Sequence, residues 1–126
     1  MNNEDVLLER SERGDIQILR FVMPSIKDTV AVLLIEDEFR RILEHAATQT
    51  PRVCIDFSCL KLLPTTVLAK MVSFWNELKK IDGQLVLCGL TSPVKAVFKS
   101  TGFDRLFRVV PDLESAVASL KKRSTA

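Results

Sequence analysis

Residues 53–68, VCIDFSCLKLLPTTVL, determine the expected fold, because an apolar strand runs into a helix start within this one stretch. The run from Val53 to Phe57 is typical of a buried central strand. Pro64 then breaks the extended pattern, and the hydroxyls of Thr65 and Thr66 open the following helix. The N-terminus of a helix is the positive end of its dipole and attracts phosphate. Any chemistry of this chain is therefore expected here.

The segment after this stretch predicts a helix and a second buried strand. From Thr66 to Ile81 apolar side chains recur at helical spacing, and Gly83 is predicted to stop the helix in the left-handed region. Gln84 to Cys88 is apolar and short enough for a strand. The expected core face of the helix comprises Leu68, Met71, Trp75 and Leu78. A neighbouring strip, which either stays exposed or packs beneath the third helix or the sheet edge, comprises Val67, Lys70 and Phe74.

The last third of the chain continues this alternation. Thr91-Ser92-Pro93 supplies a cap hydroxyl and an N1 proline for a short helix that ends at Gly102. Phe107 to Val110 is the last predicted strand, and Asp112 is predicted to cap a final helix.

The first third predicts a hairpin and a helix. Val6 to Leu8 and Ile16 to Phe21 are β-like runs that flank a polar segment, in which Gly14 supplies the turn. The helix is predicted from Leu33 to Ala47. Val30 to Ile35 could also be a strand, because periodicity cannot decide so short an apolar run.

Strands that alternate with helices indicate an α/β fold, with a mixed, mainly parallel sheet and about four helices packed against it. The 126 residues suffice for a single domain. Its core is expected over about residues 5–120, and a flexible basic tail over about residues 121–126.

Composition argues against several classes of protein. The net charge is only +2, with basic and acidic residues interleaved, so no nucleic-acid partner is expected. No apolar run reaches the ~18 residues of a membrane span, and the acidic start is unlike a signal peptide. Three cysteines without C-x-x-C spacing fit a reducing compartment. A cytoplasmic location without membrane insertion is therefore expected.

No residue pattern predicts catalysis, a metal site or a cofactor. His45 is the only histidine and is expected on a helix surface, with no second ligand at metal-binding spacing. No base is placed beside a serine or cysteine, and no phosphate-binding loop motif occurs. The chain is therefore not expected to be an enzyme.

The ordered pattern of this sequence resembles the STAS domain, the fold of anti-sigma factor antagonists and of sulphate-transporter tails. The resemblance is carried by Asp56-Phe57-Ser58, Leu62-Leu63 and Thr65-Thr66, and by LVLCG at 85–89 and TGFDRLF at 101–107. It covers about residues 5–120. It implies that a partner serine kinase phosphorylates the first hydroxyl of the helix start, which is Thr65 here.

Two residues depart from the family's usual motif, since Pro64 replaces an Asp and Val67 replaces a Gly. The first change removes a carboxylate beside the phosphorylation position. The second puts a branched side chain where a partner would approach the backbone. In the alternative reading, Thr65 and Thr66 are only capping residues of the helix.

We therefore expect a cytoplasmic interaction module that binds an anti-sigma factor or serine kinase-like partner, gated by phosphate on Thr65. The alternative is an unphosphorylated adaptor of a sensory complex or transporter, and a small enzyme or ligand carrier is a remote one. Asp56 and Ser58 either line the partner surface or hold their loop by local hydrogen bonds. The phosphorylation candidates are Thr65 and Thr66, and the partner-binding candidates are Asp56, Ser58, Pro64, Thr65, Thr66, Val67 and Ser92.

Overall fold

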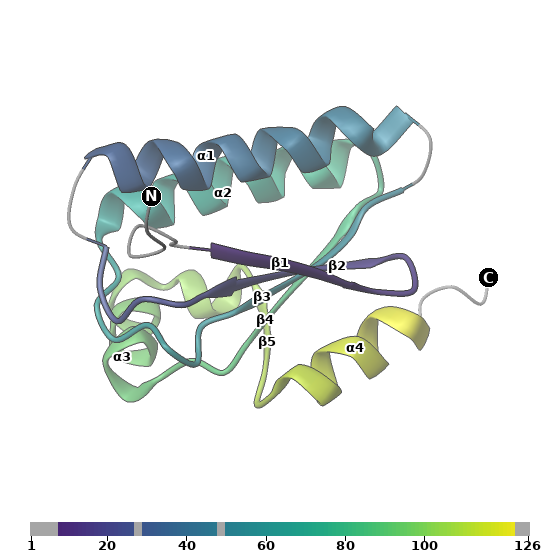
Figure 1. Ribbon diagram of the computed structural model, residues 1–126. Coiled ribbons are helices and arrows are strands. Elements are labelled where there is room, and N and C mark those ends of the chain that lie inside the picture. Colours follow the sequence, from purple (N-terminus) through teal and green to yellow (C-terminus); the bar gives the residue numbers. More distant parts are fainter. Residues whose placement is uncertain (1–7, 27–28, 48–49, 123–126) are drawn as a thin grey trace.

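The structure is a computed structural model that describes residues 8–26, 29–47 and 50–122. Within these ranges a five-stranded sheet carries four α-helices, which confirms the predicted α/β class (Figure 1). In chain order the elements are β1 (Leu8–Arg13), β2 (Ile16–Phe21), α1 (Thr29–Glu44), the 3-10 turn η1 (His45–Ala47), β3 (Arg52–Asp56), α2 (Thr65–Lys80), β4 (Gln84–Cys88), α3 (Ser92–Thr101), the 3-10 turn η2 (Phe103–Arg105), β5 (Arg108–Val110) and α4 (Leu113–Lys122).

The strand order in the sheet, β1-β2-β3-β4-β5, follows the order in the chain. β1 and β2 form an antiparallel hairpin, and the three later pairs are parallel. Parallel neighbours need a crossover connection, which the helices provide. The carboxyl ends of β2, β3 and β4 therefore share one edge of the sheet, where α1, α2 and α3 begin (Figure 1).

Successive side chains of each strand point to opposite faces of the sheet, so the strands contribute to two apolar clusters, one on each face. On the first face, strand residues such as Ile55 and Leu87 pack beneath α1 and α2, which lie side by side (Figure 1). On the second face, Cys54 and Val86 pack against α4, where Ala116 is fully buried. Burial on both faces explains why β3 and β4 are continuously apolar.

The first helix begins earlier in the chain than predicted. It begins at Thr29 rather than Leu33, and residues 45–47 form a 3-10 turn instead of continuing it. Val30 to Ile35 is therefore helical and not a strand. Its buried residues, Ile35, Phe39 and Ile42, recur at helical spacing, so one face packs on the core while others stay in solvent.

The hairpin turn contains Gly14 with φ +61°, as predicted, but β1 extends through polar residues to Arg13. Those residues pair with β2 through the backbone, which does not require apolar side chains at a sheet edge. Val6 and Leu7 of the predicted first strand lie outside the described residues.

The buried face of α2 corrects the prediction for Trp75. Phe74 is 2% exposed and stacks on Phe39 of α1 with ring centroids 4.2 Å apart, so it packs against the first helix and not beneath the third helix or the sheet edge, as the packed alternative had it. Val67 is also buried, and the exposed alternative for this strip is wrong. Trp75 is half-buried at the side of the core, where Lys79 Nζ lies 5.5 Å from its ring centroid.

The end of α2 also differs from the prediction, because Asp82 and not Gly83 adopts the left-handed conformation, with φ +60°. The N–H groups of Gly83 and Asp82 donate to the carbonyls of Leu78 and Lys79 at 2.7 and 3.3 Å, which is a Schellman motif. Gly83 is required for space, since a Cβ there would meet Leu78 Cδ2 at 2.8 Å.

The C-terminal elements agree more closely with the sequence, except that Thr91 lies at the N-cap of α3 but donates its hydroxyl to the Leu60 carbonyl and does not cap the helix. α3 ends at Gly102 with φ +78°, and Asp112 Oδ1 accepts the Ser115 N–H at 2.8 Å, as predicted for a cap. The 3-10 turn η2 was not predicted, and β5 begins at Arg108 rather than Phe107. α4 extends to Lys122, and the rest of the predicted tail lies outside the described residues.

Candidate functional site

The site candidates gather at the carboxyl edge of the sheet, where the loops after β2, β3 and β4 meet the starts of the helices (Figure 1). The loop between β3 and α2 is held from both sides. The N–H groups of Lys61 and Leu62 donate to the Pro24 carbonyl at 2.8 and 3.2 Å, and Thr91 Oγ1 donates to the Leu60 carbonyl at 2.7 Å. The start of α2 is therefore fixed by both neighbouring loops.

Asp56 holds this loop by a local hydrogen bond. It ends β3 and is only 7% exposed, and its Oδ1 accepts the Ser58 N–H at 2.9 Å. The same oxygen would lie 2.8 Å from a Cβ at Gly89, which has φ +69°. The structure thus favours the local role of Asp56 over a role in partner contact, whereas the side chain of Ser58 is exposed.

Pro64 occupies the N-cap position of α2, with φ −68° and ψ 150°, and no side chain caps the helix. Its carbonyl accepts the N–H groups of Val67 and Leu68 at 3.0 and 3.2 Å. Thr65 is therefore the first residue inside the helix, so the N-cap position that the alternative reading gave to this pair belongs to Pro64, whereas Thr66 lies in the first turn. Both threonines are exposed at the positive end of the helix dipole.

Val67 is one of the predicted partner-binding residues, but its side chain does not lie on the surface. It is 0% exposed and faces the core. Ser92 is exposed as the first residue of α3, and Pro64 is half-buried. The structure therefore brings four exposed candidates to this edge of the sheet, namely Ser58, Thr65, Thr66 and Ser92.

Exposed apolar side chains on α1 were missed by the sequence reasoning. Val30, Leu33 and Leu34 are 63%, 56% and 46% exposed in the first turns of this helix. Lys70 Nζ of α2 lies 3.0 Å from Glu36 Oε2, so the first turns of the two helices lie side by side. The continuous apolar run could have revealed this patch, since a single helix face cannot bury adjacent positions.

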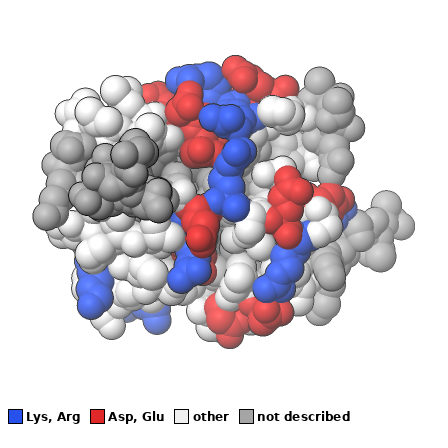
Figure 2. Space-filling model, in the orientation of Figure 1, with Lys and Arg blue, Asp and Glu red and all other residues white. Residues whose placement is uncertain are grey.

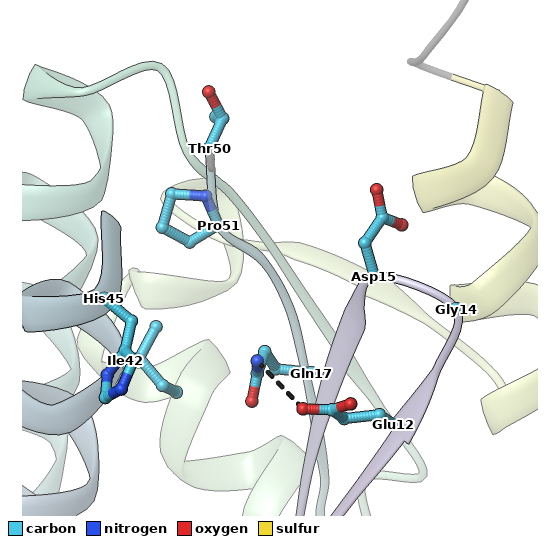
Figure 3. Close-up of a pocket in the computed structure, with 8 residues that line it drawn as sticks. All are labelled: Glu12, Gly14, Asp15, Gln17, Ile42, His45, Thr50 and Pro51. Atoms are coloured by element: carbon cyan, nitrogen blue, oxygen red, sulfur yellow. Dashed lines mark hydrogen bonds between the residues drawn. The ribbon is translucent and has the colours of Figure 1, made fainter. Parts of the chain in front are cut away.

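A cavity of about 280 Å³ lies at the opposite edge of the sheet, between the β1–β2 hairpin and the end of α1 (Figure 3). Gln17 Nε2 donates to Glu12 Oε2 at 3.4 Å there, and the ring of His45 is exposed on the surface, as predicted. His45 Nδ1 lies 2.8 Å from the Arg41 carbonyl oxygen. Within residues 8–26, 29–47 and 50–122, no group of three or more His, Cys, Asp or Glu could hold a metal ion.

The cysteines of β3 and β4 behave as small apolar core residues. Cys54 and Cys88 are buried with their sulfur atoms 3.6 Å apart. The hydrogen bond with Cys88, together with burial, raises the pKa of Cys54 well above that of an ordinary thiol. Such a thiol is a poor nucleophile.

The visible surface in Figure 2 shows Lys and Arg next to Asp and Glu, with acidic side chains beside the run of basic side chains near the centre of that face. Among the helices of the described residues, none has the length and apolar character needed to cross a membrane.

Comparisons with known proteins identify the family of this chain. A family model, the STAS domain, matches residues 8–116. A relative named as an anti-sigma factor antagonist, BtrV of Bordetella bronchiseptica, is 33% identical over 70 residues, which span 56% of this chain. The match spans 60% of the length of that relative.

Solved structures share the fold at low sequence identity. A STAS domain protein from Planctomyces limnophilus has a TM-score of 0.77 and 17% identity, over 90% of this chain and 96% of its own. The anti-sigma factor antagonist SpoIIAA in its unphosphorylated form has a TM-score of 0.76 and 16% identity, over 91% of this chain and 96% of its own.

The extent of the family match shows that the chain belongs to the STAS domain family. Within that family it is similar to anti-sigma factor antagonists, which are regulatory proteins.

Proposed function

We propose that this chain is a non-catalytic regulatory module, in the manner of an anti-sigma factor antagonist, and that its partner binds at the start of α2. The observation that carries this proposal is the exposure of Thr65 and Thr66 on an uncapped helix start whose preceding loop is fixed on both sides. A rigid, exposed helix terminus can present the same surface to a partner at each encounter.

The partner is an anti-sigma factor of the serine kinase-like class, acting in the cytoplasm. Its contact surface on this chain combines the hydroxyls of α2 with the exposed apolar side chains of Leu33, Leu34 and Leu62. Leu62 is 60% exposed and forms a β-bridge with Ser25, in the loop that leads to α1. Apolar side chains beside polar groups are typical of protein interfaces.

Phosphate on Thr65 is the proposed switch. The N–H groups of Thr65 and Thr66 precede the first intrahelical bonds, which begin at Val67, so they can donate to a phosphate. The dianion would also place charge beside the apolar part of the contact surface and oppose docking by desolvation. The same local change therefore both stabilises the modified helix start and weakens partner binding.

Incubation with ATP and the cognate anti-sigma serine kinase tests the proposed residue. Intact-mass analysis is expected to show one added phosphate on the wild type and on Thr66→Ala, and none on Thr65→Ala. Thr66→Ala is the matched control, because it removes an equally exposed hydroxyl one residue along the same helix. Phosphate persisting on Thr65→Ala would contradict the assignment.

A second candidate function is supported by Pro64, which gives this helix start no carboxylate and no side-chain cap. In that case the chain is an unphosphorylated adaptor of a sensory complex or transporter. Native protein that carries no phosphate and co-purifies with such subunits, but with no kinase, would decide for the adaptor.

A further inference from the structure

A cavity of about 390 Å³ lies at the edge of the sheet opposite to the start of α2, between α2, β4, β5 and α4. It exists because β5 has only three residues and pairs with β4 from Val86 onward. Gln84 and Leu85 at the start of β4 therefore have no partner on β5, and both line the cavity. We call this cavity the β4–β5 notch. Its volume falls in the range of small-molecule sites.

Two buried polar atoms lie in residues that line the notch. Gln84 Oε1 and Ser119 Oγ are inaccessible to solvent, and neither has a hydrogen-bond partner among the described residues. Buried polar atoms in proteins are normally hydrogen-bonded, because leaving one unpaired is unfavourable. Gln84 as a whole is only half-buried, so a rotation of its side chain can turn this oxygen, which can only accept, toward a ligand O–H or N–H in the notch.

Two arginines that line the notch have no acidic partner among the described residues. Arg105 and Arg108 line the cavity, are exposed, and make no ion pair with any residue in the described parts of the chain. By contrast, Arg13 and Arg52 pair with Glu114 and Asp15. Guanidinium groups bind carboxylates and phosphates well, because their donors match the geometry of these anions.

Apolar side chains also line the notch. Trp75, Leu106 and Phe107 line it, and Leu106 is 36% exposed. An aromatic or aliphatic ring could therefore bury surface here while its charged end faces the arginines.

We propose that the β4–β5 notch binds a small organic anion that has an apolar ring and a hydrogen-bond donor. The anionic group pairs with Arg105 and Arg108, the ring packs on Trp75 and Leu106, and the donor binds Gln84 Oε1. This site is independent of the partner surface on α2, since it lies at the opposite edge of the sheet. An experiment that contradicts one of the two proposals therefore does not contradict the other.

Trp75 makes the proposal directly measurable, because it lines the notch and is the only tryptophan in a chain without tyrosine. The probe is trans-4-hydroxycyclohexanecarboxylate, which carries an anion, an apolar ring and a hydroxyl and does not absorb in the tryptophan band. Titration is expected to change the Trp75 emission with saturation at millimolar concentration or below. Cyclohexyl phosphate, tested in a second titration, distinguishes a phosphate preference from a carboxylate preference.

Two pairs of variants separate binding from general charge effects. Replacing Arg105 and Arg108 together by Gln is expected to weaken probe binding by at least about tenfold. The same double replacement of Arg40 and Arg41, on the exposed side of α1, removes the same charge and is expected to leave binding unchanged.

The donor contact is tested by comparing the probe with cyclohexanecarboxylate, which lacks the hydroxyl. Wild type is expected to prefer the hydroxylated compound severalfold, and Gln84→Leu is expected to lose this preference while still binding both. A purely structural role for Gln84 would change stability but not this ratio. The proposal is overturned if neither anion gives a saturable change, if both arginine pairs weaken binding equally, or if Gln84→Leu keeps the preference.

Discussion

At the scale of single residues, the contact between Asp56 and Gly89 ties the loop after β3 to the loop after β4. Asp56 Oδ1 accepts the Ser58 N–H, and the same oxygen occupies the space that a Cβ of residue 89 would need. Gly89 also has a positive φ of 69°. Two independent physical requirements therefore select glycine at this position.

The variant Gly89→Ala is expected to destabilise the protein more than Gly14→Ala does. Gly14 has φ +61°, and a Cβ added there would meet nothing within 4 Å, so its replacement costs only the backbone strain, about 1–2 kcal/mol. Gly89→Ala adds the clash with Asp56, a further loss of roughly 1–3 kcal/mol. Urea denaturation of the two variants measures the difference, and equal losses of stability would show that the Asp56 contact relaxes freely.

At the scale of an element, α2 begins without a side-chain cap, because the ring of Pro64 has no polar atom that could accept the first N–H groups of the helix. The backbone of residue 64, with φ −68° and ψ 150°, is also accessible to Asp. The chain therefore lacks a stabilising side-chain cap that the backbone conformation at residue 64 would allow.

Comparison of Pro64→Asp with Pro64→Ala isolates the effect of a cap, since both lose the proline ring. The Asp variant is expected to be more stable by about 1 kcal/mol, because its carboxylate can accept the N–H groups of Thr66 or Val67 and complements the helix dipole. Denaturation midpoints at neutral pH measure this difference. Identical midpoints would mean that the first turn of α2 gains nothing from a cap.

The comparison of sequence and structure also belongs at this scale. Short apolar runs bounded by Pro or Gly predicted β3, β4 and their place in the sheet correctly, because burial on both faces leaves a strong signal. The choice between Phe74 and Trp75 could not be predicted, since they differ by about 100° around the helix and the position of α1 decides which one is buried.

The candidate site was predictable only in part. The exposed threonines of the helix start follow from the strand, proline and hydroxyl pattern. The burial of Val67 depends on how α1 and α2 pack together, which no local pattern contains, whereas the exposed patch around Leu33 could have been inferred from the continuous apolar run of α1.

At the scale of the whole molecule, the two apolar clusters bury Cys54 and Cys88 but leave Cys59 half-buried. The pKa of Cys54 is raised by its hydrogen bond with Cys88 and by burial, so its thiolate is scarce in the folded state. Thiol reactivity should therefore report on unfolding of the entire domain.

With a thiol-reactive chromophore under native conditions, Cys59 is expected to react rapidly and the other two cysteines only at the rate of global opening. Cys59→Ser should remove the fast phase and leave the slow phase unchanged. The slow rate should rise with urea in parallel with the loss of stability. A fast reaction at Cys54 or Cys88 in the Cys59→Ser variant would reveal local opening of the sheet instead.

The strand order, which matches the order of the chain, has a consequence for folding during synthesis. A ribosome adds about 5–20 residues per second, so the strands are synthesised one after another. The neighbour of each new strand in the sheet has already been synthesised when that strand emerges. α4 is the exception, because it covers strands that were synthesised much earlier, including Ile16 and Ile18 of β2. Until α4 is synthesised, that face of the nascent sheet is exposed and accessible to chaperones. The packing of α4 on this face is the last step in forming the fold.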